Sequence, residues 1–188
     1  PLTEKLFSNK KDFEEKLNYY APALTALTLN SPFYKGVLKK YQSEHYIKSI
    51  RTFRRSTIAP LLEWHQNEDN RIEFKFFEMT DSVEDFESYF SMCLALALED
   101  DFQGRALSQE AIYTMGEVAV LGLQSPYVNV VLEEFFSKSF STLRRHGFDC
   151  ISLKRMQKRW KSGKTPADHL IDSYQKNLSL EEIFRDLI

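Results

Sequence analysis

The sequence predicts a mainly α-helical protein with a small β component. Over most of the 188 residues, apolar side chains recur at the three- and four-residue spacing of a helix. Residues 71–79 alternate instead with a period of two and are rich in aromatic side chains, which indicates one half-buried strand. Charged side chains lie on one side of this strand and apolar ones on the other: Arg71, Glu73 and Lys75 against Ile72, Phe74 and Phe76. We interpret residues 1–188 as a single helix-rich domain, because no linker or internal repeat divides them.

The composition is typical of a globular protein. The formal net charge of −2 gives no general reason to expect nucleic acid or an anionic membrane as a partner. No apolar run approaches the roughly 20 residues of a membrane-spanning helix, and the amino end lacks the layout of a signal peptide. Cys93 and Cys150 lack metal-like spacing, so we expect two buried thiols in a reducing cytosol, with a disulfide as the alternative. The prediction is a cytoplasmic protein.

The first third of the chain is expected to be helical. Ser8 is a suitable cap for a helix that begins near residue 9. Pro22 either kinks this helix or starts a second one, because proline lacks the N–H group that a helix interior needs. The Asn-Ser-Pro sequence at residues 30–32 ends the pattern, and residues 37–66 resume it. The strand at 71–79 would therefore follow a long helix.

The strand is followed by another helix, which Ser82 caps and which runs to about residue 99. Its inward face is predicted to consist of Phe86, Phe90, Cys93, Leu94 and Ala97. A further helix begins at residue 107 or 108 and ends between Gly122 and Ser125-Pro126. These segments complete the middle of the predicted helical core.

Glycine and proline punctuate the last third of the chain. A helix from about residue 129 closes with basic residues, and Gly147 is its expected left-handed cap. The next helix covers residues 152–161 and stops at Gly163. Thr165, followed by proline and then an acid, starts another helix. Ser179 starts a short terminal one.

Two groups of charged residues are candidates for a functional site. Glu73 and Lys75 share a strand face about 6 to 7 Å apart. A carboxylate there could hold Mg²⁺, and a cation could neutralise a transferring phosphoryl group; the alternative is a surface ladder of cross-strand ion pairs. Arg51 and Arg55 lie one helical turn apart and could clamp a carboxylate or phosphate, or could belong to a solvated helix face.

The sequence gives little support for a nucleic-acid site, a zinc site, a phosphate-binding loop or a catalytic nucleophile. The basic residues between 154 and 161 suit nucleic acid only weakly, because acidic helices flank them. The four histidines lack zinc-binding spacing, and the six glycines form no phosphate loop. No serine, cysteine or histidine arrangement indicates a nucleophile. From residues alone, the sequence predicts a helical domain with one charged strand.

Three segments, in the same order, resemble the carboxyl-terminal half of the type 2 glutamate–cysteine ligase family, in the glutamine synthetase-like superfamily. The first contains Asn-Ser-Pro-Phe and a following glycine, the second is a charged strand running into a helix that opens with an acid, and the third contains Gly-Lys-Thr-Pro-Ala. They are residues 24–36, residues 71–85 and residues 162–170. The resemblance covers residues 20 to about 175.

The resemblance implies ATP-dependent formation of an amide, as in glutathione biosynthesis. ATP would phosphorylate a glutamate-like carboxylate, and an amine would then displace the phosphate. Glu73 matches the metal-binding glutamate of the family and would hold Mg²⁺ against the phosphates. Lys75 stands where the family usually has arginine, so it would bind ATP with the same charge but without the two-pronged guanidinium. Arg51, in Ser49-Ile-Arg51, would correspond to the arginine of a Ser-x-Arg element that meets the substrate carboxylate; the alternative, residues 43–45, has the better spacing but lacks the arginine.

The family resemblance also implies a missing partner. The amino-terminal half of such ligases carries a Glu-x-Glu strand and further strands of the sheet, and no segment here resembles it. The leading hypothesis is a carboxyl-terminal ligase portion that needs its missing half or a partner subunit; the strand at 71–79 would otherwise pair across a homodimer or with an unexpected neighbour. The alternative is a degenerate, non-catalytic relative that acts as a helical protein-binding module. A third interpretation is that the resemblance is accidental.

Overall fold

The protein is mostly helical, with small antiparallel β-ribbons, so the predicted fold class is confirmed. The computed structural model describes residues 2–28, 33–34, 37–38, 62–65, 71–74, 76–77, 80–106, 117–118 and 121–175. The helices are α1 (Leu2–Ser8), α2 (Lys10–Leu27), α4 (Val83–Leu98), the short 3-10 helix η1 (Gly122–Gln124), α6 (Pro126–Arg145), α7 (Ile151–Ser162) and α8 (Pro166–Gln175). The strands are β1 (Phe33–Tyr34), β2 (Val37–Leu38), β3 (Leu62–His65) and β4 (Arg71–Phe74).

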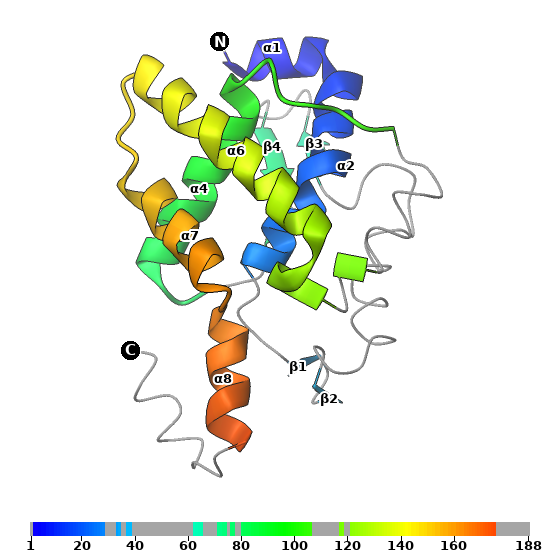
Figure 1. Cartoon of the computed structure of the whole chain (residues 1–188). Helices are drawn as coiled ribbons and strands as arrows, with labels where there is room; N and C mark the ends of the chain where they lie inside the picture. Colours follow the sequence, from blue (N-terminus) through cyan, green and yellow to red (C-terminus); the bar gives the residue numbers. More distant parts are fainter. Residues whose placement is uncertain are drawn as a thin grey trace.

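Helix α6 is the central element of the bundle. It packs against both α2 and α4, and α7 packs along α4 (Figure 1). Helix α8 leaves this bundle beyond the end of α7 (Figure 1). None of the helices in the described ranges combines the length and the apolar character needed to cross a membrane.

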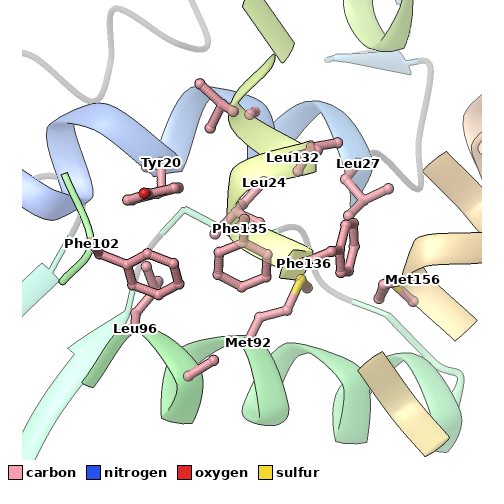
Figure 2. Packing of buried hydrophobic residues seen from close by; sticks show 14 of the residues in the cluster. Tyr20, Leu24, Leu27, Met92, Leu96, Phe102, Leu132, Phe135, Phe136 and Met156 are labelled. Carbon is pink, nitrogen blue, oxygen red and sulfur yellow. The ribbon is translucent and has the colours of Figure 1, made fainter. Parts of the chain in front are cut away.

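The buried side chains of these helices form one hydrophobic cluster. Figure 2 shows its centre, where side chains from four helices and the segment after α4 meet: Tyr20, Leu24, Leu27, Met92, Leu96, Phe102, Leu132, Phe135, Phe136 and Met156. The ring of Phe135 stacks on Phe102 at a centroid distance of 5.5 Å and lies 5.9 Å from Tyr20. Phe135 therefore joins α6 to α2 and to the segment that follows α4.

The strand predicted at residues 71–79 is shorter than expected. Strand β4 ends at Phe74, and Phe76 and Phe77 lie in a bend. Its partner is β3, with Leu62 opposite Phe74 and His65 opposite Arg71. Residues 62–65 were predicted to end a long helix, and that prediction is wrong. Residues 62–65 form a strand instead, since they pair with β4 and the resulting ribbon packs on α2.

The predicted inward face of α4 is also partly wrong. Phe86 and Phe90 are 67% and 63% exposed, whereas Tyr89 and Met92 are buried. Ala97 is buried as expected, and Cys93 and Leu94 are half-buried. The helix is apolar on more than one side, so spacing alone does not choose the face that meets the core.

Several predicted helix ends are confirmed. The Ser82 hydroxyl accepts a hydrogen bond from the Asp85 N–H at 3.1 Å, which caps α4. Gly147 and Gly163 follow α6 and α7 with φ of 81° and 67°, in the left-handed region. Thr165 and Asp168 form the predicted start of α8, with the Thr165 N–H donating to the Asp168 carboxylate at 2.8 Å.

Other helix ends differ from the predictions. The Ser8 hydroxyl donates to the Glu4 carbonyl within α1, so it does not cap α2. Helix α2 continues through Pro22 as one helix, so the alternative of a second helix that starts at Pro22 is wrong. The helix before α6 ends at Leu121, next to the predicted Gly122, whereas α6, which Ser125 caps, begins at Pro126 rather than near residue 129. The predicted helix over residues 39–61, most of the one after residue 107 and the terminal one after Ser179 lie outside the described residues.

Candidate functional site

The β3–β4 ribbon carries the described part of the predicted site. Arg71 and Glu73 are exposed on one face of β4, and Ile72 and Phe74 are half-buried on the other and pack against the core. The predicted separation of charged and apolar faces is therefore confirmed for residues 71–74. The alternation follows from the strand itself, since successive side chains point to opposite sides.

Aromatic contacts hold the apolar face of the ribbon on α1 and α2. Phe13 of α2 meets Phe74 and Trp64 edge-on, at centroid distances of 6.0 and 6.1 Å. The Trp64 indole also contacts Phe7 and donates a hydrogen bond from Nε1 to the Glu14 carboxylate at 3.0 Å. A ribbon of two strands is marginal in isolation, so this packing is what fixes it.

The charged face of the ribbon combines a carboxylate with a histidine. Glu73 Oε2 lies 3.4 Å from His65 Nε2, across the two strands, and the Glu73 side chain remains 50% exposed. The contact is the cross-strand pairing that the alternative interpretation expected.

The other two predicted site residues, Lys75 and Arg51, lie outside the described residues. The chain immediately after Lys75 is placed, however. Phe76 is buried, and its carbonyl accepts a hydrogen bond from the Thr25 hydroxyl of α2 at 3.2 Å. The end of β4 is therefore attached to α2 on either side of residue 75, by Phe74 and by Phe76.

Glu73 fits a magnesium site only as one of several ligands. Among the described residues, no three histidine, cysteine or acidic side chains gather as a metal-binding group. Magnesium, however, commonly takes one or two protein carboxylates and completes its octahedron with phosphate oxygens and water. An exposed carboxylate on a rigid strand suits that shared role and does not suit a site built from this ribbon alone.

A buried ion pair that sequence reasoning missed joins the second family-like segment to α7. One guanidinium nitrogen of Arg159 donates to both Asp85 oxygens, at 2.7 and 2.8 Å, and both side chains are largely buried. Arg155, one turn earlier, donates to the Glu84 carbonyl at 2.7 Å. The basic residues of α7 could have indicated these contacts in the sequence, because Arg155 and Arg159 are four residues apart and lie on one helix face.

Contacts join the first two family-like segments to each other and the second to the helix that precedes the third. Thr25, in the first, donates to Phe76 in the second. Asp85, at the end of the second, binds Arg159, which lies on the helix leading into the third. The Tyr89 hydroxyl also reaches the Thr28 carbonyl at 3.5 Å, so α4 meets the end of α2. Segments far apart in the sequence therefore form one connected framework around the ribbon.

Comparison with known proteins found no matching family model, no matching curated protein and no matching solved structure.

Proposed function

We propose that this chain is the helical carboxyl-terminal portion of an ATP-dependent carboxylate–amine ligase similar to glutamate–cysteine ligase. The supporting observation is the exposed carboxylate of Glu73 on a ribbon whose other face is fixed to α2. The hydrogen bond between Thr25 and Phe76 supports the proposal further, because a site assembled from distant segments requires them to lie close together.

In this proposal, the chain's residues orient charged substrates. Glu73 holds Mg²⁺ together with the phosphates of ATP, and Lys75 offsets the charge of the transferring phosphoryl group. Arg51 binds a carboxylate of the glutamate-like substrate. Mg²⁺ held there would neutralise phosphate charge. A substrate carboxylate oxygen bonds to the γ-phosphorus as ADP leaves, and an amine nitrogen then bonds to the acyl carbon as phosphate leaves.

The proposal also requires further strands from a missing half or a partner subunit. In the described part of the chain, β4 pairs with β3 and the sheet has two strands. A sheet of two strands is too small to enclose a nucleotide. In this proposal, the other groups that bind ATP and Mg²⁺ come from the missing half or the partner subunit. We place the protein in the cytoplasm, where ATP is available and where Cys93 and Cys150, both free, stay reduced.

Reconstitution tests the proposal. The 188-residue chain is mixed with an amino-terminal half that carries a Glu-x-Glu strand, and ADP release is measured with Mg-ATP, glutamate and an amine. We expect activity only in the mixture. Glu73→Gln should lower it about a hundredfold or more, because the metal loses a charged ligand. Asp81→Asn, at an exposed carboxylate beyond β4, is the matched control and should leave the activity unchanged.

Failure of the mixture to release ADP, with both halves folded, would contradict the ligase proposal. Equal activity of Glu73→Gln and the original chain would contradict the role of Glu73. Lys75→Arg is a further test, since it restores the guanidinium usual in the family and should maintain or raise the rate.

A second candidate is a non-catalytic protein-binding module. The observation that favours it is the exposure of Phe86 and Phe90 on α4. Mass spectrometry of the native protein separates the two: a mature mass near 22.1 kDa with no co-purifying partner favours the module. A larger precursor or a tightly bound second subunit favours the ligase portion.

A further inference from the structure

Helix α4 presents an apolar surface to solvent. Phe86 and Phe90 lie one turn apart and are 67% and 63% exposed, and Val83, one turn before Phe86, is 69% exposed. Ile151, at the start of α7, is 66% exposed. Large aromatic side chains that gather on one exposed surface mark interaction sites more often than scattered ones do.

Two grooves flank the Phe86–Phe90 ridge, and both aromatic rings line each of them. The first groove, of about 360 Å³, lies between α4 and the connection from α6 to α7, with Leu94, Phe148 and Ile151 on its walls. The second, of about 430 Å³, lies between α4 and the chain after β4, with Phe74 and Phe77 on its walls. An apolar side chain from a partner can therefore contact either side of the same ridge.

The charged residues that line the first groove are both acidic. Glu87 and Asp149 line opposite walls and are exposed. None of the described residues that line either groove is basic. Arg155 lies near the ridge, but its guanidinium donates to the Glu84 carbonyl and the Ser88 hydroxyl. The grooves therefore combine apolar walls with carboxylates and suit a ligand that is apolar on one side and positively charged at its edges.

We propose that this surface binds an amphipathic helix of a partner protein, with an apolar face on the Phe86–Phe90 ridge and lysine or arginine at its flanks. An amphipathic helix in a hydrophobic groove is a common mode of peptide recognition. Charge selects this occupant over a second copy of the chain, because two copies face to face would bring Glu87 and Asp149 of each into like-charge contact. The surface lies on α4, separate from the charged face of the ribbon, so the proposal does not depend on ligase activity.

A library of helical peptides provides the probe. Each displayed peptide has leucines at helical spacing on one face, and its flanking positions vary between lysine and glutamate. The full 188-residue chain is the target, and the affinity of retained peptides is measured by fluorescence anisotropy. We expect enrichment of lysine at the flanks and a loss of affinity of roughly tenfold or more in Phe86→Ser and in Phe90→Ser.

Two further variants make the test specific. Val130→Ser changes an exposed apolar residue on α6, and it should leave the affinity unchanged. The variant Glu87→Lys reverses the charge of one groove wall at an exposed position, and it should weaken or reverse the enrichment of lysine at the flanks. This charge variant leaves both phenylalanines in place, so it tests the proposal even if Phe86→Ser or Phe90→Ser folds poorly.

The proposal is overturned by any of several results. These are no retained peptides, flanks without lysine enrichment, or equal binding to the original chain and the Phe86→Ser and Phe90→Ser variants. Sedimentation velocity supplies another: a dimer of the original chain that Phe90→Ser dissociates would show that a second copy covers this surface.

Discussion

At the scale of single residues, the Asp85–Arg159 ion pair connects the start of α4 to α7. Asp85 also lies in the first turn of its helix, where a carboxylate is favoured by the helix dipole. Arg159 Nη1 is buried without a hydrogen-bond partner within the described structure, so Asp85 carries most of the compensation for this buried cation. The pair holds the end of the second family-like segment on the helix that leads into the third.

Removing one member of this ion pair is expected to destabilise the folded chain. Asp85→Ala should lower the free energy of unfolding by roughly 3 kcal/mol, because it leaves the Arg159 charge buried without its partner. Urea denaturation followed by circular dichroism measures the change. Asp81→Asn, at an exposed carboxylate nearby, is the control and should be nearly neutral. A similar small effect for Asp85→Ala would mean that Arg159 finds another partner or water.

At the scale of elements, α4 shows why a helix can be predicted while its orientation is not. Phe86 and Phe90 form one apolar stripe, and Tyr89, Met92 and Leu96 form another. Both stripes satisfy helical spacing, and the more aromatic one faces solvent. Contacts with α6 and α7 decide the orientation, and these contacts have no local signature in the sequence.

The two stripes of α4 should respond differently to substitution. Met92→Ala should cost about 2 to 5 kcal/mol of unfolding free energy, because Met92 is fully buried in the core. Phe90→Ser should change it by about 0.5 kcal/mol or less, since its ring is mostly exposed already. Urea denaturation of both variants measures the contrast, and equal losses would mean that α4 is rotated from the orientation described.

At the scale of the whole molecule, Glu99 lies where three helices meet. Its carboxylate accepts hydrogen bonds from the Thr142 hydroxyl of α6 and, at 3.0 Å, from the Asp101 N–H, and its carbonyl accepts from Lys16 of α2. Burial acts to raise the pKa of Glu99, but these hydrogen bonds to the carboxylate and the nearby Arg145 outweigh burial. The pKa is therefore lower than its ordinary value of 4.5.

The direction of this shift predicts how stability depends on pH. A carboxyl group with a lower pKa in the folded chain stabilises the fold above its unfolded pKa, and this contribution is lost as the pH falls through the folded value. Thr142→Val should cost about 1 to 2 kcal/mol near neutral pH, and the cost should shrink below about pH 4 as Glu99 becomes protonated. Urea denaturation of the original chain and of Thr142→Val, from neutral pH to below about pH 4, measures this loss of unfolding free energy. Ser141→Ala is the neighbouring control, and a pH-independent cost would contradict the role of the Glu99 charge.

The sequence by itself determined the helical class, several helix ends and the two faces of β4. These features depend on local chemistry: a capping hydroxyl at Ser82, left-handed glycines such as Gly163, and alternation along the strand. Tertiary structure alone decided the strand state of residues 62–65, the exposed stripe of α4 and the burial of Arg159. Each of these depends on which distant surface an element meets, and several surfaces compete for the same apolar or charged side chains.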